Sequence, residues 1–356
     1  MSIARYPALS VELEDRIRAG FYHDGFPTMR ELRTEFRTSL STVAKALEPL
    51  LKRRLLVSAG CRRGIRIDAK RRQAPRGVVG LVSRDEMMND GILMQRLVER
   101  CRADVFEPEL IVFNSRHFAR NLEKLFPRHF AGVIFAFSSL TVEAAMWLRG
   151  AQIPFVSGNV LQVLPGLNYV EHNHAGAWRR LVMALQAHGY RKIGIFFPSQ
   201  IESIYDYCRS IWWNLAQELG VPGSACEKFI PDWTLDIYGN LVSFLHFMAH
   251  HDDWPDALIY WNGGIGAEVV KRCFAADGSG LPARTLLVGI PEPGITGNLH
   301  AALVQPLDYM PLMDALYQAL RERIVAPEAP PLRRLVDYPI EFLQPIPERR
   351  VIANRL

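Results

Sequence analysis

The chain has 356 residues, of which 49% are hydrophobic and 22% are charged, and its formal net charge is +5. This length suits two or three domains, and no apolar run is long enough to cross a bilayer as a helix. Residues 1–16 are charged and lack the apolar core of a secretion signal, so we expect a cytoplasmic protein.

Several kinds of site find no support in the sequence. The five cysteines are scattered and form no Cys-x-x-Cys pair, which argues against a disulfide framework or a zinc site. Histidines and aspartates within residues 172–174 and 246–253 have metal-like spacing, but no third ligand converges on either group. No phosphate-binding loop or Gly-x-Ser-x-Gly elbow is present. We therefore expect no metal, no cofactor and no enzymatic activity.

The positive charge is concentrated at one end of the chain. Residues 1–76 hold 17 lysines and arginines against 8 aspartates and glutamates, so the rest of the chain is slightly acidic. A compact basic head favours a polyanionic partner for that head. The alternative is that arginine-rich helices only solvate a surface.

The head, residues 1–67, reads as three helices followed by a hairpin. Ser10 is expected to cap a first helix that runs to about Ala19. Thr28-Met-Arg-Glu31 is a capping box for a second helix, and Ser39 caps a third. The apolar stripe of the third helix is Leu40, Val43, Leu47, Leu50 and Leu51, and its opposite face shows Ser41, Lys45, Glu48 and Lys52.

Two short strands then flank a basic tip. Residues 55–57 and 65–67 are the strands, and Gly60-Cys-Arg-Arg-Gly64 joins them. Helix, turn, helix and hairpin suit an arrangement in which the third helix enters the major groove of double-stranded DNA. Arg62 and Arg63 at the tip suit the phosphate backbone or the minor groove.

These motifs resemble the GntR-type winged helix-turn-helix over about the first fifth of the chain. The resemblance implies that Arg30 grips phosphate and that Ser39 and Thr42 begin the recognition helix. Leu40 and Ala44 stand where members of that family often have arginine, which implies altered base readout. The predicted DNA contacts are Arg30, Ser39, Ser41, Thr42, Lys45, Arg62 and Arg63.

A polar, basic linker over residues 68–76 follows the head. It is expected to let the head adjust to DNA, and an ordered docking of the head against the body is the alternative. The sequence does not decide between the two.

From Gly77 onward, strands and helices alternate. The expected strands cover residues 78–82, 110–113, 132–137, 155–157, 192–197, 257–261 and 286–289, and expected helices include residues 92–102, 141–150 and 176–189. This rhythm predicts an α/β fold with parallel sheets covered by helices on both faces.

The body, residues 77–345, resembles the LacI/GalR-type effector domain, which shares the periplasmic-binding-protein fold. The residues that carry the resemblance are Val170-Glu-His-Asn-His-Ala-Gly176, His188-Gly-Tyr-Arg-Lys-Ile-Gly194, residues 254–262, 288–292 and 304–306, which follow in family order. The resemblance implies two doubly wound lobes, one over about 77–164 and 292–325 and the other over about 165–291 and 330–345. A GntR-type head on such a body resembles arabinose-type repressors.

The resemblance also implies an effector between the two lobes, at the carboxyl ends of the strands. Sugar-binding members place an arginine and an aspartate where this chain has Tyr207 and Gly263. Trp233 and Trp261 could stack on a sugar ring, although core packing is the alternative for each tryptophan. The candidate effector residues are Arg84, Asp85, Phe137, Ser138, Tyr207, Trp233, Trp261, Asn262 and Glu292.

Together these features predict a homodimeric DNA-binding transcription regulator, a repressor that responds to a small polar effector of the carbohydrate kind. One alternative is a regulator whose body binds a protein or no ligand. Two further classes are a solute-binding transport component and a regulator fused to an enzyme. The basic head argues against the transport component, and the strand order and scarcity of lysine argue against the fused enzyme.

Overall fold

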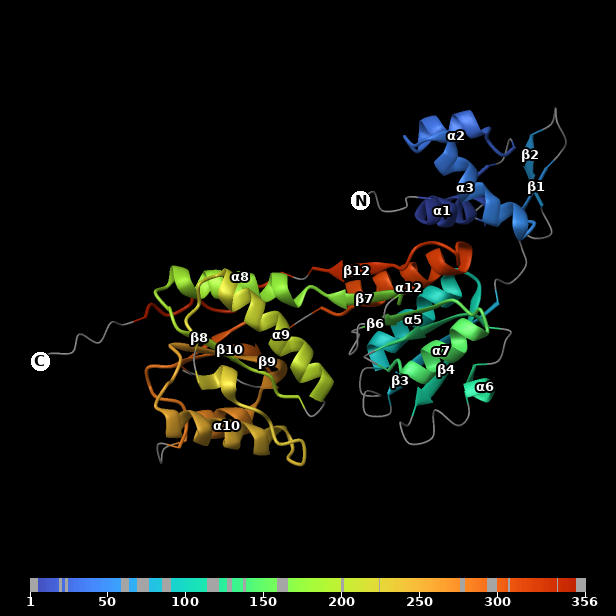
Figure 1. Cartoon of the computed structure of the whole chain (residues 1–356). Coiled ribbons are helices and arrows are strands. Elements are labelled where there is room, and N and C mark those ends of the chain that lie inside the picture. The colour runs from blue at the N-terminus through green and yellow to red at the C-terminus, as the bar shows by residue number, and fades with distance from the viewer. Residues whose placement is uncertain are drawn as a thin grey trace, which may run out of the picture. The chain divides into compact units, whose positions relative to one another are not determined.

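The computed structural model describes residues 6–18, 21–22, 25–58, 64–68, 77–84, 91–113, 122–126, 130–136, 139–158, 166–199, 202–223, 225–275, 279–292, 300–306, 308–337 and 339–349. The chain forms two compact units (Figure 1). The first comprises Met1–Glu171 and Tyr309–Val336, and the second comprises His172–Asp308 and Asp337–Leu356.

The first unit begins with three helices and a hairpin, in the order that the sequence predicts. The elements are α1 (Tyr6–Arg18), α2 (Met29–Glu35), α3 (Leu40–Lys52), β1 (Leu56–Ser58) and β2 (Ile65–Ile67). The two strands pair antiparallel, with Leu56 opposite Ile67. Leu9, Leu13 and Ile17 recur every fourth residue on α1 and pack in one apolar core with α2 and α3.

Two of the three predicted helix caps are present. The Thr28 hydroxyl accepts a hydrogen bond from the Glu31 amide, and the Glu31 carboxylate accepts one from the Thr28 amide. The Ser39 hydroxyl accepts a hydrogen bond from the Thr42 amide at 3.1 Å. The cap predicted at Ser10 is wrong, because α1 already begins at Tyr6. Ser10 is instead fully buried, and its hydroxyl donates to the carbonyl oxygen of Ala46 on α3 at 2.7 Å.

A six-stranded sheet forms the body of the first unit. Its strands are β3 (Gly77–Arg84), β4 (Phe106–Phe113), β5 (Phe130–Phe135), β6 (Phe155–Gly158), β7 (Tyr169–His172) and β12 (Arg333–Val336), in the order β12-β7-β6-β5-β3-β4. Strands β4, β3, β5, β6 and β7 pair in parallel. Val79 and Leu81 belong to one apolar cluster and Val82 to another, so the sheet is buried on both faces as its continuous apolar runs predict.

Helices cover both faces of this sheet. Helices α5 (Gly91–Ala103) and α12 (Met310–Val325) pack on one face, and α6 (Leu122–Leu125) and α7 (Val142–Gly150) pack on the other. Helix α12 lies directly on the strands, since a Cβ atom at Gly132 would come within 2.8 Å of the Leu320 side chain.

The second unit holds a four-stranded parallel sheet. Its strands are β8 (Ile193–Phe196), β9 (Ala257–Ile265), β10 (Leu286–Pro291) and β11 (Ala301–Leu303), in the order β11-β10-β9-β8. Helices α8 (His174–Ala187) and α9 (Glu202–Glu218) pack on one face. Helices α10 (Ile237–His251) and α11 (Ala267–Cys273), with the 3₁₀ turn Ala225–Lys228, pack on the other. The predicted α/β class with parallel sheets is confirmed.

Three stretches lie in different units from the lobes predicted by sequence. Residues 165–171 were expected with the second lobe, yet β7 pairs with β6 in the sheet of the first unit. Residues 292–308 were expected with the first lobe, yet β11 pairs with β10 in the second unit. Residues 330–336 were expected with the second lobe, yet β12 extends the sheet of the first unit beside β7. Strands β11 and β12 are short and lie at the edges of their sheets. Their own sequences do not indicate which sheet each of them joins.

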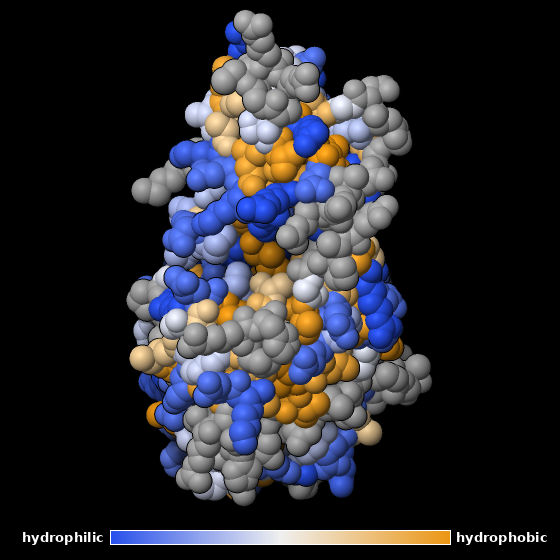
Figure 2. Space-filling view, turned by 90° about the vertical axis from the view of Figure 1, so that its right-hand side faces the viewer, coloured by the Kyte–Doolittle hydropathy of each residue, from blue (hydrophilic) through white to orange (hydrophobic). Residues whose placement is uncertain are grey.

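The surface is mixed in character. Hydrophilic side chains cover much of the face that Figure 2 shows, and smaller apolar patches lie between them. No helix within the described residues is long and apolar enough to cross a membrane.

Candidate functional site

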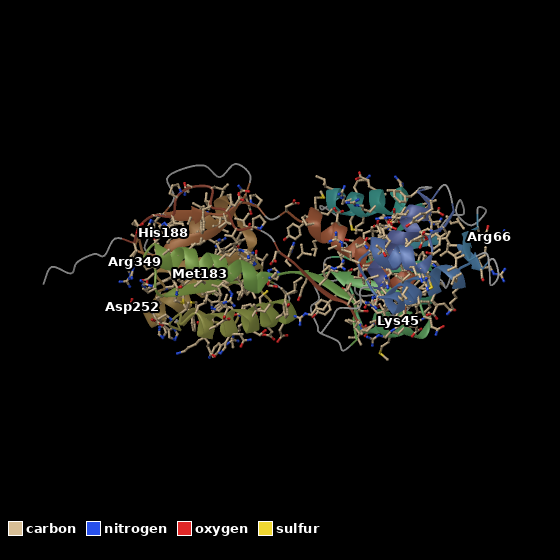
Figure 3. All side chains as sticks on the ribbon, turned by 90° about the horizontal axis from the view of Figure 1, so that it is seen from above. Lys45, Arg66, Met183, His188, Asp252 and Arg349 are labelled. Carbon is tan, nitrogen blue, oxygen red and sulfur yellow. The ribbon has the colours of Figure 1, made fainter. Side chains whose placement is uncertain are left out.

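The exposed face of the head carries most of its predicted DNA contacts. Arg30 is exposed on the first turn of α2, and Ser41 and Lys45 are exposed on α3. Ser39 is exposed and Thr42 is half-buried at the start of α3. Figure 3 shows Lys45 at the periphery of the head.

The periodicity of α3 explains this arrangement. Val43, Ala46, Leu47 and Leu50 are buried in the head core, so the residues between them face outward. Leu40 was expected in the apolar stripe, but 41% of its surface is exposed. It is the first residue of α3, and the helix there has not yet reached the core. Leu40 and Ala44 thus both lie on the exposed outer face of α3.

Hydroxyl groups cluster at the beginning of α3. The Ser39 oxygen lies 2.8 Å from the hydroxyl oxygens of both Ser41 and Thr42. The amide groups of a helix N-terminus and its positive dipole end favour a negatively charged group. Serine and threonine hydroxyls can donate to phosphate oxygens or to base edges. This end of α3 is therefore suited to contact nucleic acid.

Further cations surround this face and were not singled out from the sequence. Arg33, Arg37 and Arg66 are exposed in the head, and Figure 3 shows Arg66 at its periphery. Arg66 lies between two inward-facing isoleucines on β2. The alternation of side chains along a strand would have predicted from the sequence that Arg66 faces outward. The predicted contacts Arg62 and Arg63 lie outside the described residues.

Three acidic residues of the head pair with other arginines. Arg16 pairs with Glu12 and Glu35, and the buried Glu14 pairs with Arg18 and Arg53. The structure shows no ion pair between a described carboxylate and Arg30, Arg33 or Lys45. These three side chains keep their charge available to a partner.

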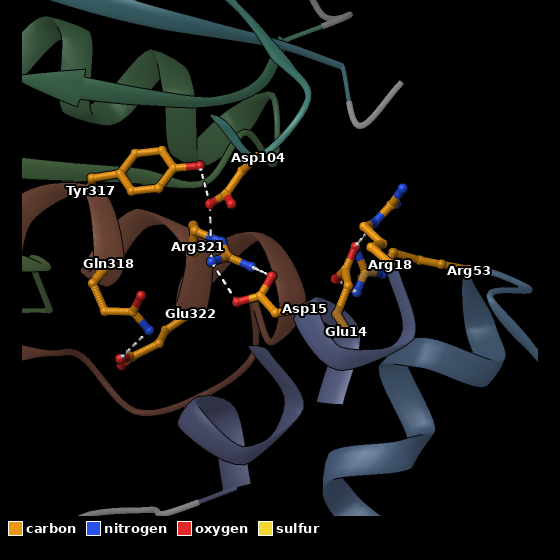
Figure 4. A network of polar contacts seen from close by, with 9 residues as sticks. All are labelled: Glu14, Asp15, Arg18, Arg53, Asp104, Tyr317, Gln318, Arg321 and Glu322. Carbon is orange, nitrogen blue, oxygen red and sulfur yellow. Dashed lines mark hydrogen bonds and ion pairs between the residues drawn. The ribbon is translucent and has the colours of Figure 1, made fainter. Parts of the chain in front are cut away.

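The head docks on the body through α1 and α12, and this contact lies inside the first unit. Arg321 of α12, whose side chain is only 7% exposed, forms two hydrogen bonds to the Asp15 carboxylate of α1. Its guanidinium also lies 2.9 Å from an Asp104 oxygen, to which the Tyr317 hydroxyl donates at 2.6 Å. Figure 4 shows this network. Burial disfavours the Arg321 charge, but the pairs with Asp15 and Asp104 outweigh burial and raise its pKa.

In the second unit, the predicted effector residues lie in different environments. Glu292 is exposed just past the end of β10, and its side chain lies over Gly264 and Gly266, where a Cβ atom would overlap its carboxyl group. Tyr207 on α9 and Trp233 are half-buried against the unit's core, and Trp233 stands edge-on to Tyr205 at 5.7 Å between ring centroids.

Trp261 does not form the exposed stacking surface suggested by sequence. It is 1% exposed and packs edge-on against Trp178 within the core under α8 and α9. The physical reason is that β9 is a central strand, where alternate side chains face a helical layer. Asn262 lies on β9 and Arg84 ends β3, but the structure does not describe their side chains. Asp85, Phe137 and Ser138 lie outside the described residues.

No group of three or more histidine, cysteine, aspartate or glutamate side chains within the described ranges is arranged to hold a metal ion. His251 uses its Nδ1 atom in a 2.8 Å contact with the Phe247 carbonyl of its own helix. His172 and His174 lie among the aromatic rings at the β7–α8 junction.

Solved structures resemble this chain over three quarters of its length or more. The transcriptional regulator CelR in complex with cellobiose is 16% identical, with a TM-score of 0.56 over 91% of this chain and 100% of the other. A LacI family transcriptional regulator from Enterococcus faecium with bound ribose is 14% identical, with a TM-score of 0.53 over 76% and 99%. CcpA of Lactococcus lactis is 13% identical, with a TM-score of 0.55 over 75% and 97%.

This chain has the fold of LacI-family transcriptional regulators. No family model matches the sequence. No curated protein matches it either. The identities of 13–16% mean that the likeness is one of fold.

Proposed function

We propose that this protein is a DNA-binding transcription repressor controlled by a small polar effector of the carbohydrate class. The observation that carries the proposal is the combination of a basic, unpaired helix face in the head with a body of the LacI-family fold. The proposal includes a homodimer on double-stranded operator DNA, because regulators with such heads read two half-sites. It includes no catalytic step.

We infer that the head is a winged helix-turn-helix of the GntR type. Its order of elements, the capping box at Thr28 and the cap at Ser39 support this inference. In this scheme α3 enters the major groove, Arg30 and Lys45 contact phosphates, and β1 and β2 form the wing. Leu40 on the outer face contributes apolar contact in place of a guanidinium, which would favour a thymine methyl over guanine.

The effector would bind at the carboxyl ends of the parallel strands, the edge that such sheets use for ligands. Glu292 lies at this edge of the second unit and would accept hydrogen bonds from hydroxyl groups. CelR is described with cellobiose and the Enterococcus faecium regulator with ribose, which supports a carbohydrate for this chain. Tyr207 and Gly263 provide no charged group where sugar-binding members have one, so the contacts to the ligand must differ.

One observation favours a second candidate function, a regulator whose body binds a protein or no small ligand. Trp178 and Trp261 are completely packed in the core of the second unit. Aromatic side chains that fill a core do not offer a stacking surface to a sugar ring.

DNA binding by the full chain tests the proposal. Selection from a random double-stranded DNA library should enrich a sequence with two half-sites. Substitutions Arg30→Gln and Lys45→Gln should each weaken binding and lower the slope of log K against log salt by about 1, since each removes one phosphate contact. Lys271→Gln, an exposed lysine of the second unit, is the matched control. Absence of any enriched sequence, or unchanged salt slopes in both head variants, would overturn the proposal.

A further inference from the structure

A cavity of about 550 Å³ lies within the first unit, where the head meets the body. It is lined by Lys52 at the end of α3, by Arg149 at the end of α7 and by Arg323 of α12. Glu328 is its one acidic lining residue among those described. The volume falls in the range of sites for small molecules.

Arg323 is a buried cation on this wall. It is 5% exposed, and its two terminal nitrogens each donate at 2.6 Å, to the carbonyl oxygens of Ala329 and Pro330. Its Nε atom is buried and has no hydrogen-bond partner among the described residues. A guanidinium has five N–H donors, so most of its capacity is unused. Burial lowers the pKa of Arg323 although the charge of Glu322 opposes this effect, and an anion in the cavity would further favour the charged guanidinium.

The charge of the cavity selects a class of ligand. Lys52, Arg149 and Arg323 line the cavity together with one carboxylate, that of Glu328, so basic groups outnumber acidic ones among its described lining residues. A phosphate group carries a charge of about −1.5 to −2 at neutral pH, and its oxygens match the donors of arginine and lysine. Asn168 does not compete for the ligand, because its amide is held by the Phe155 carbonyl and the Leu332 amide.

We propose that this cavity binds a small anion carrying a phosphoryl group, at a site separate from that of the carbohydrate effector. Lys52 belongs to the head, whereas Arg149 and Arg323 belong to the body. A ligand that contacts all three stabilises the docked head by linkage, and above its dissociation constant this stabilisation grows with the logarithm of the ligand concentration. Binding at this site therefore gives the protein a second ligand, besides the effector, that controls the position of α3 relative to the rest of the first unit.

Isothermal titration calorimetry of the full chain, in chloride buffer without DNA, tests the site with two probes. The probes are inorganic phosphate and glycerol 3-phosphate, and glycerol is the uncharged comparison. We expect saturable binding of one equivalent of a phosphoryl probe per chain and none of glycerol. Equal affinities for the two probes would show that the phosphate group alone is sufficient for binding. Tighter binding of glycerol 3-phosphate would show that the ligand of this site is a phosphoester.

Two exposed residues provide the variants, because Arg323 also holds the loop at Ala329 and its loss would disturb the fold. Lys52→Gln and Arg149→Gln together should weaken binding at least tenfold. Lys124→Gln, an exposed lysine on α6 away from the cavity, should bind as the unaltered chain does. Failure of both probes to bind, or equal affinity in the double variant, would overturn the proposal.

Discussion

Ser10 and Glu14 show how single polar residues organise the head. Both lie on α1 and both are buried, at 0% and 1% exposure. Ser10 bonds to the backbone of α3, and Glu14 pairs with Arg53 just beyond the end of α3. A buried polar group costs free energy unless it is paired, so these contacts specify one arrangement of the two helices.

Two neighbouring histidines, the buried His172 and the half-buried His174, should make stability depend on pH. Burial lowers the pKa of His172 to about 4, and burial together with the neighbouring His172 lowers the pKa of His174 to about 3. In the unfolded chain both take up a proton near pH 6.5, so the unfolded state binds more protons as the pH falls. Stability is therefore complete above about pH 6.5 and is lost as the pH falls toward 4, by about 3 kcal/mol for His172.

Tryptophan fluorescence during urea unfolding would measure this loss, because Trp178 lies beside His174. The free energy of unfolding should fall between pH 7 and pH 4.5, and His172→Asn should reduce that fall. His250→Asn, an exposed histidine of the same unit, should leave it unchanged. The same pH dependence in His172→Asn and the unaltered chain would contradict the assignment.

At the scale of elements, α12 connects the parts of the first unit. Its apolar residues pack on the sheet, and its Asp314 pairs with Arg96 and Arg100 of α5. These two arginines hold the pKa of Asp314 well below its usual range. The same helix binds α1 of the head through Arg321. One element therefore positions the head, the sheet and α5.

Loss of the Arg321 guanidinium should loosen the head. Arg321→Met leaves the carboxylates of Asp15 and Asp104 without their cation, which should lower the free energy of unfolding by about 3 kcal/mol. Backbone amides of α1 should then exchange hydrogen faster. Gln318→Met, one turn earlier on α12, is the matched control. Unchanged exchange in α1 would show that apolar contacts alone dock the head.

At the scale of the molecule, two parallel sheets each end in an edge suited to ligands, and the head carries an exposed basic face. Binding at one place changes affinity at the other only if the two ligands favour different states of the protein. The proposed repressor function requires such a coupling between the effector and the operator.

Operator affinity with and without a carbohydrate measures this coupling. A sugar that raises the melting temperature of the full chain should change operator affinity by about 5- to 150-fold, the usual range of allosteric coupling. Glu292→Gln should weaken the response to the sugar, and Glu109→Gln, an exposed glutamate on β4, should not. A sugar that saturates the protein and leaves operator affinity unchanged would exclude the coupling.

Local features of the fold could be predicted from the sequence. The capping box at Thr28, the cap at Ser39, the outward face of α3 and the central strands of both sheets follow from spacing within a few residues. Hydrophobic period and cap chemistry act over one or two turns, so the sequence carries them in full. The exposed positions of Arg30 and Lys45 belong to this class.

Other features were decided only by tertiary structure. The sheets that β11 and β12 join, the burial of Trp261 and the pairing of Arg321 with Asp15 depend on residues far apart in the chain. Arg321 and Asp15 are separated by 306 positions. The local sequence pattern does not indicate which distant carboxylate pairs with a charged side chain, because that partner is determined by how whole helices and sheets pack.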